Sequence, residues 1–135
     1  MNAFIVDLTN KPGELARLAE AIAQKGINIT GFAGATTGGA GTAVIVTNDE
    51  AGTRNAIGEK GFRAREIELV MAALENKPGS LAAAAKKLAD AGINVEAALP
   101  TGMSGENVSI AFATDNPAKA RELLGAAAPT GIGVG

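Results

Sequence analysis

The sequence of 135 residues contains no cysteine and no histidine. Thiol nucleophiles, disulfides, iron–sulfur clusters, cysteine–histidine zinc sites and histidine acid–base chemistry are therefore excluded. Tryptophan and tyrosine are also missing, and four phenylalanines make up the 3% aromatic content, which leaves few rings for stacking on bases or sugars. The sequence shows no paired carboxylates at a catalytic spacing and no nucleophile beside a base. We therefore predict a protein that is not an enzyme, with no catalytic residues, no metal site and no cofactor.

An excess of charge of one sign and long apolar runs are missing as well. The chain has 12 basic and 14 acidic side chains, a formal net charge of −2, and so lacks the basic surface that phosphate backbones require. No stretch approaches the roughly 20 apolar residues that cross a bilayer. Asp7 interrupts the first apolar run, and the N-terminus lacks the basic start of a secretory signal. We expect a cytoplasmic protein that binds neither nucleic acid nor a membrane.

What the sequence does contain is an internal repeat. Asn-Lys-Pro-Gly at residues 10–13 recurs at 76–79, and Gly-Ile-Asn at residues 26–28 recurs at 92–94. The offset is the same in both cases, since 76 − 10 and 92 − 26 each give 66. The spacing between the two motifs is thus preserved, which is typical of a duplicated structural unit.

The repeat extends over most of the chain. Residues 8–29 and 74–95 agree at 12 of 22 positions without a gap. The same offset of 66 places Asp49 on Asp115, beyond the repeated motifs. We therefore predict two domains, residues 1–66 and residues 67–135, the second with a short or weak last strand because its end is rich in glycine.

Each copy predicts the element order βαββαβ. An apolar run at residues 4–9 precedes a helix whose apolar residues recur at intervals of three and four. Gly26 and Gly92 stand where a left-handed residue would end this helix in a Schellman motif, because an isoleucine follows each. The other expected elements are strands at 42–47, 62–66 and 108–113, and helices at 50–60 and 117–127 capped by Asp49 and Asp115. The predicted fold class is α+β, with antiparallel sheets and the helices on one face.

The boundary between the copies has its own pattern. Phe62, Ala64 and Glu66 alternate on one register, whereas Ile67 and Leu69 alternate on the opposite one. Because successive side chains of a strand point to opposite faces, this change predicts a bulge or a short turn near residues 66 and 67.

The start of the first helix in each copy is a candidate anion site. Lys11 is a poor N-cap and Pro12 has no N–H, so the N–H groups of Gly13, Glu14 and Leu15 lack an obvious side-chain acceptor. Free donors at a helix start favour a carboxylate or another small anion, and a glycine lets a ligand approach the backbone. The alternative is that Pro-Gly is only a tight strand-to-helix turn whose donors face water.

The asparagines Asn28 and Asn94 are further candidates, because their amides can both donate to a carboxylate and accept from an ammonium group. The alternative is a turn residue that bonds its own backbone. The glycine-rich stretch at residues 38–41 precedes a strand instead of a helix and lacks the Gly-Lys-Ser/Thr ending, so it indicates a hairpin loop and not a phosphate loop.

The residues from Leu8 to Leu15, followed by Gly-Ile-Asn at 26–28, resemble the ACT domain, as do their counterparts in the second copy. ACT domains are ferredoxin-like βαββαβ modules in the regulatory regions of amino-acid biosynthetic enzymes. The resemblance covers nearly the whole chain and implies two such modules. It also implies that modules pair side by side and hold a small effector, commonly an amino acid, at their interface.

The resemblance further implies where that ligand binds. In the family it meets the loop and helix start after the first strand, and the start of the second strand. The corresponding residues are Asn10, Pro12, Gly13, Glu14, Leu15, Asn28, Ile29 and Thr30, and in the second copy Asn76, Gly79, Ser80, Leu81, Asn94 and Val95. Many family members carry aspartate where this chain has Asn10 and Asn76, so the ligand or its affinity is expected to differ.

Our leading hypothesis is a non-catalytic regulatory protein, forming a homodimer, that senses an amino acid or a similar small carboxylate at an interface between modules. The alternative is a ligand-independent regulatory subunit that pairs with a metabolic enzyme through its sheet edges.

Overall fold

The computed structural model describes residues 1–125, and the chain divides into two compact units. The first unit is residues 2–67, and the second comprises Met1 and the residues from Glu68 onward. One strand, β4 (Ala64–Glu75), contributes its beginning to the first unit and the rest to the second. The expected bulge or turn near residues 66 and 67 is therefore wrong. Leu69 and Val70 are both fully buried, so this part of the strand is covered on both faces and alternation no longer marks one inward side.

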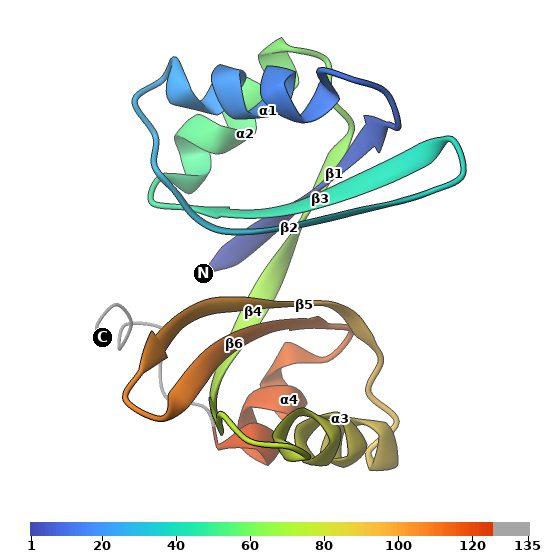
Figure 1. Cartoon of the computed structure of the whole chain (residues 1–135), viewed down its shortest axis with the longest axis vertical. Helices are drawn as coiled ribbons and strands as arrows, with labels where there is room; N and C mark the ends of the chain where they lie inside the picture. The colour runs from blue at the N-terminus through green and yellow to red at the C-terminus, as the bar shows by residue number, and fades with distance from the viewer. Residues whose placement is uncertain (126–135) are drawn as a thin grey trace. The chain divides into compact units, whose positions relative to one another are not determined.

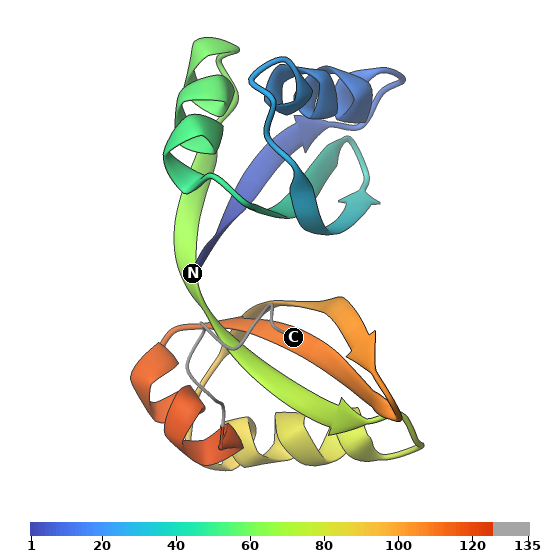
Figure 2. The same ribbon diagram turned by 90° about the vertical axis from the view of Figure 1, so that its left-hand side faces the viewer.

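The first unit has helices on one face of an antiparallel sheet (Figures 1 and 2). Its strands lie in the order β2-β3-β1-β4, and β3 pairs antiparallel with both β1 and β2. Its core lies between the sheet and the helices and is centred on Phe4, Leu18 and Ile45. Apart from β4, its elements are β1 (Asn2–Thr9), α1 (Glu14–Ala23), β2 (Ile29–Thr37), β3 (Ala40–Thr47) and α2 (Glu50–Glu59).

The second unit repeats this arrangement. The strand order is β4-β6-β5, with β6 antiparallel to both neighbours, and a core around Val70, Leu88 and Phe112. Its other elements are α3 (Ser80–Asp90), β5 (Val95–Ser104), β6 (Asn107–Thr114) and α4 (Pro117–Leu124). The prediction of an α+β fold with antiparallel strands is confirmed, whereas the short last strand predicted for the second copy lies outside the described residues.

The first helix of each copy ends as the glycine pattern predicts. Gly26 and Gly92 both adopt φ of 72°. The N–H of Ile27 donates to the carbonyl of Ile22 at 3.4 Å, and that of Gly26 donates to Ala23 at 2.9 Å. The second copy makes the same pair of bonds after α3. These are the two bonds of a Schellman motif, so this prediction is confirmed.

The two copies do not keep an offset of 66 to their ends. Phe4 pairs with Ile45 in the first unit and Val70 pairs with Phe112 in the second, so the offset is 70 − 4 = 66 in the first strand but 112 − 45 = 67 in the third. The additional residue enters at an irregularity of β5 between Pro100 and Gly102 that β2 lacks. A proline has no N–H to donate to the ladder, which suits it to such a bulge.

This shift changes one predicted cap. Asp49 caps α2 as expected, because its Oδ1 accepts from the N–H of Gly52 at 2.9 Å. The cap of α4 is Asn116 and not Asp115, since the Asn116 Oδ1 accepts from the N–H of Lys119 at 3.2 Å. Asp115 instead accepts from the N–H of Asn94 at 3.0 Å. The caps of α2 and α4 are therefore related by an offset of 67, whereas the ungapped comparison of the copies used 66.

Candidate functional site

Helix α1 begins without a side-chain cap. The residue before it, Gly13, has φ of 90° and ψ of −11°, and none of the described side chains bonds the helix start. Among residues 1–125, the N–H groups of Gly13 and Leu15 have no hydrogen-bond partner, and that of Glu14 reaches the carbonyl of Lys11 only at 3.5 Å. A Cβ on Gly13 would meet no described atom within 4 Å. Glycine is therefore required here by the left-handed backbone and not by a close contact.

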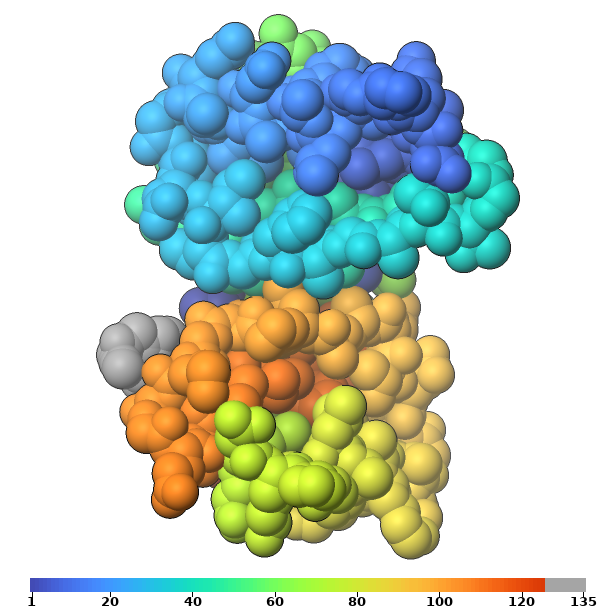
Figure 3. Space-filling model, viewed as in Figure 1, coloured from blue at the N-terminus to red at the C-terminus, as the bar shows by residue number. Residues whose placement is uncertain are grey.

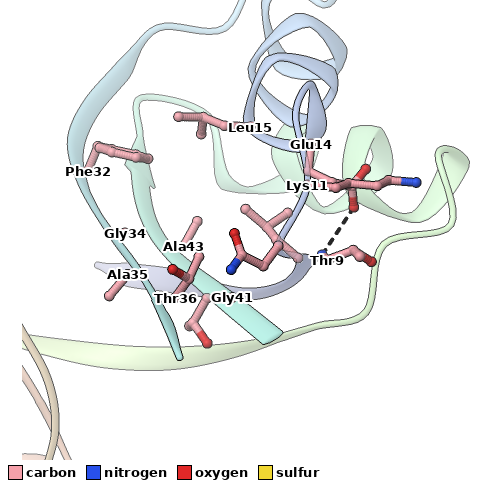
Figure 4. Close-up of a pocket in the computed structure, with 13 residues that line it drawn as sticks. Thr9, Lys11, Glu14, Leu15, Phe32, Gly34, Ala35, Thr36, Gly41 and Ala43 are labelled. Atoms are coloured by element: carbon pink, nitrogen blue, oxygen red, sulfur yellow. Dashed lines mark hydrogen bonds between the residues drawn. The ribbon is translucent and has the colours of Figure 1, made fainter. Parts of the chain in front are cut away.

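The Glu14 side chain folds back onto the loop that precedes α1. One oxygen accepts from the N–H of Thr9 at 3.2 Å (Figure 4). The other accepts from Nε of Arg17 at 3.1 Å. The bond from Thr9, followed by that from Arg17, lowers the pKa of the Glu14 carboxyl. Arg17 in turn donates to the Lys60 carbonyl at 3.1 Å and lies 3.9 Å from the ring centre of Phe62. Glu14 thus fixes the loop, and its charge is already engaged.

Beside this loop lies a pocket of about 390 Å³ in the first unit. The end of β1, the start of α1 and the β2–β3 hairpin border it, and the last two lie next to each other on the surface drawn in Figure 3. The volume falls in the usual range for small-molecule sites. The lining residues are Leu8, Thr9, Asn10, Lys11, Glu14, Leu15, Phe32, Gly34, Ala35, Thr36, Gly41, Thr42 and Ala43.

The pocket has apolar walls and a floor of small residues. Leu15 from α1 and Phe32 from β2 point toward one another across it (Figure 4), and they are 49% and 44% exposed. The floor is formed by Gly34 of β2, which pairs with Ala43 of β3, and by Gly41, which lies two residues before Ala43. All three residues therefore face the side of the sheet that carries the core. Because these three residues carry little or no side chain, the floor between the two apolar walls is low, and Gly41 and Ala43 are buried beneath it.

The polar rim of the pocket carries an amide and an ammonium group. The Asn10 Nδ2 donates to the carbonyl of Gly38 at 2.8 Å, which fixes the amide and leaves its Oδ1 as an acceptor. The Lys11 ammonium has no hydrogen-bond or ion-pair partner among the side chains that the structure describes. The site therefore combines a positive group, a fixed amide oxygen and an apolar cleft.

Of the site residues predicted in the first copy, Asn10, Glu14 and Leu15 line this pocket. Pro12 and Gly13 belong to the same loop but are not among the lining residues. These five residues are brought together by the turn between β1 and α1.

Asn28, Ile29 and Thr30 do not line the pocket. The Asn28 N–H donates to Oδ1 of Asn48 at 3.0 Å, and the Asn48 N–H donates to the Asn28 carbonyl at 3.1 Å. Ile29 packs against the core, and the Thr30 hydroxyl donates to the Val46 carbonyl at 3.3 Å. The structure gives these residues a place at the beginning of β2, and their contact with a ligand stays a prediction.

The predicted residues of the second copy occupy the matching places. Gly79 repeats the conformation of Gly13 with φ of 90°, Ser80 is the first residue of α3, and Leu81 is 56% exposed. The N–H of Asn76 donates to the carbonyl of Glu106 at 2.8 Å. Asn94 is held by Asp115 in the same way as Asn28 by Asn48, and Val95 packs against the core of its unit.

Sequence reasoning missed most of the hairpin side of the pocket, above all Phe32, Gly34, Thr36, Gly41 and Ala43. Residues 38–41 were predicted only as a hairpin loop, and on the two strands only Ile29 and Thr30, at the start of β2, were predicted at a site. A signal was present, because inward positions of a strand that carry glycine or alanine leave space on a sheet.

A cluster of metal-binding side chains and a membrane-spanning helix are both absent from residues 1–125. No three acidic side chains are grouped so that they would hold a metal ion. None of the helices in this part of the chain is long and apolar enough to span a membrane.

Comparison with known proteins gives the following picture. Residues 3–59 match the ACT domain. No curated protein matches the chain. A solved structure of a protein from Bacteroides thetaiotaomicron is similar, with 22% identity, coverage of 92% of this chain and 85% of that chain, and a TM-score of 0.77.

Regulatory subunits of aspartate kinase are similar as well. The ligand-free subunit from Thermus thermophilus has 17% identity and a TM-score of 0.65, and the match covers 92% of this chain and 89% of the chain of that subunit. The subunit from Thermus flavus has 18% identity and a TM-score of 0.62, and the match covers 92% of this chain and 90% of the chain of that subunit. These similarities show a common fold.

Proposed function

We propose that the chain is a non-catalytic regulatory protein, built from two ferredoxin-like ACT modules, that binds an amino acid in the pocket of its first unit. The observation that carries this proposal is the pocket itself, which lies between the start of α1 and the β2–β3 hairpin within the residues that match the ACT domain. It joins an apolar cleft to groups suited to both ends of an α-amino acid.

The chemistry of the rim suggests how such a ligand is held. The carboxylate would lie near the Lys11 ammonium and the open N–H group of Leu15 at the start of α1, where the helix dipole is positive. The ligand's ammonium group would donate to Oδ1 of Asn10. Glu14 is engaged with Thr9 and Arg17, so it would shape the loop and not pair with the ligand.

The apolar walls suggest the ligand's side chain. Leu15 and Phe32 face one another with about half of their surface exposed, and an apolar side chain between them would remove both from water. The open side of the pocket would be covered by a second ACT module, as at the interface of a homodimer. Ligand binding would then be coupled to association, because the ligand binds the paired arrangement more tightly than the separate one.

The proposal is tested by the melting temperature in the presence of each proteinogenic L-amino acid in turn. A ligand at about 100 times its dissociation constant stabilises the folded state by roughly 2.7 kcal/mol, which raises the melting temperature by several degrees. Amino acids with apolar side chains are expected to give the largest shift.

A substitution connects that shift to the pocket. Replacing Phe32 by alanine removes a wall that is 44% exposed. The binding free energy should become less favourable by about 1 kcal/mol, and the dissociation constant should rise roughly fivefold. Met103, which is 65% exposed in the second unit, serves as control, since Met103→Ala should leave the constant unchanged. If no amino acid shifts the melting temperature, the protein is instead a ligand-independent partner of a metabolic enzyme, to be found by co-purification.

A further inference from the structure

The two units differ at the floor of the pocket. Gly41 and Ala43 of β3 correspond to Val108 and Ile110 of β6, because 41 + 67 = 108 and 43 + 67 = 110 and both strands keep the same register with the first strand of their unit. Ile110 packs against the core of the second unit together with Leu74. Where the first unit has a glycine and an alanine, the second unit carries two branched side chains.

The walls and the rim differ as well. Phe32 pairs with Ile45 in β3, and the residue in that place of the second unit, opposite Phe112, is Ala98. The aromatic wall is therefore reduced to a methyl group. The second copy of the rim lysine is Lys77, and its ammonium lies 3.1 Å from the Glu75 carboxylate, whereas the first unit has an uncharged threonine at the position of Glu75.

We infer that the ligand binds to the first unit alone, and that the second unit is a structural copy whose own side chains occupy the place of the ligand. This inference rests on the proposed function. It follows from volume, because Val108 and Ile110 stand where the first unit has a glycine and an alanine, and from charge, because a carboxylate, Glu75, lies beside Lys77. The chain would take up one amino acid, although its sequence repeat suggests two equivalent sites.

The experiment is isothermal titration of the full chain with each proteinogenic L-amino acid, and it measures both affinity and stoichiometry. The unmodified chain is expected to bind one equivalent. The variant Gly41→Val gives the first unit the floor residue of the second. A Cβ there lies 3.1 Å from the Thr36 methyl and 3.4 Å from the Leu8 carbonyl oxygen, so the pocket is filled and the affinity is expected to fall about tenfold or more.

Two further variants guard against loss of folding and non-specific effects. Leu15→Asp changes a wall residue that is 49% exposed, so the fold is retained while a negative charge meets the ligand's carboxylate and binding is lost. Gly102→Val is the matched control, because a Cβ at Gly102 meets no described atom within 4 Å and the position lies in the second unit. It should bind within about twofold of the unmodified chain, since no contact of the pocket changes.

The outcomes separate the inference from the proposed function. One equivalent in the unmodified chain, lost in Gly41→Val or Leu15→Asp and retained in Gly102→Val, supports the inference. Two equivalents per chain, or one equivalent that survives both first-unit substitutions, overturns the inference while the protein remains an amino-acid sensor. If no amino acid binds to the unmodified chain, the proposed function fails and the inference with it.

Discussion

The backbone at the start of α1 allows conformational strain to be measured apart from contacts. Gly13 has φ of 90°, and a Cβ there would meet no described atom within 4 Å. The variant Gly13→Ala therefore adds no clash, and its cost comes from holding an L-residue in the left-handed region, about 1–2 kcal/mol. We expect the free energy of unfolding to fall by that amount.

The matched control is Gly58→Ala in α2. A Cβ at Gly58 also meets no described atom within 4 Å, but the residue is helical and its φ is not left-handed. Alanine should stabilise this helix by about 0.5–1 kcal/mol. The two variants have the same change of composition, so their free energies of unfolding should differ by roughly 1.5–3 kcal/mol.

Urea denaturation followed by circular dichroism measures this difference as a shift in the transition midpoint. Equal midpoints for Gly13→Ala and Gly58→Ala would refute the reasoning, because the left-handed backbone at Gly13 and the helical backbone at Gly58 require effects of opposite sign. The equivalent position of the second unit, Gly79, has the same φ of 90° and should respond like Gly13.

Three other predictions concern stability. Asp49→Ala removes the cap that accepts from the Gly52 N–H, and should lower the free energy of unfolding by about 0.5–2 kcal/mol, measured in urea against Asp49→Asn, which keeps a capping oxygen. Leu18→Ala empties a fully buried position and should cost about 2–5 kcal/mol, seen as a lower melting temperature. The Arg54 guanidinium, 2.6 and 2.7 Å from the Glu66 carboxylate, lowers the pKa of Glu66 below 4.5. Because the folded state then binds this proton less readily than the unfolded state, the stabilisation is present above pH 4.5 and is lost as the pH falls through the lowered pKa. The stability of Arg54→Met should therefore decline less between pH 6 and 3, and an identical pH profile for both proteins would contradict this cause.

The parts of the fold that the sequence predicted well depend on local interactions. The ends of α1 and α3 need only a glycine and a following isoleucine, and both Schellman motifs formed as expected. The cap of α4 was assigned to Asp115 instead of Asn116 because the extra residue in β5 lies in an edge strand, where no sequence pattern marked it. The bulge predicted near residues 66 and 67 was wrong for a related reason. Leu69 and Val70 are buried on opposite faces of β4, so the apolar residues do not alternate there although the strand is continuous.

The candidate site was predictable to a similar degree. Asn10, Glu14 and Leu15 belong to one short loop, so a local motif was enough to select them. Phe32 and Gly41 come from two other strands and enter the pocket only through the pairing of the hairpin. Single-sequence reasoning does not fix that register. The difference between Gly41 and Val108 was visible only once the offset of 67 was known.

The additional residue of the second copy lies in β5, which among the described residues has a neighbouring strand on one side only. An insertion there disturbs one ladder, whereas the same insertion in β6 would disturb two. The wall residue Phe32 and the floor residue Gly34 belong to β2, which occupies the same edge position in the first unit. After a duplication, a substitution on this edge strand of the proposed pocket thus disturbs one ladder, whereas a substitution on an inner strand, such as valine in place of Gly41, affects two. Descendants of this chain should therefore diverge at the wall of the proposed pocket sooner than in their fold.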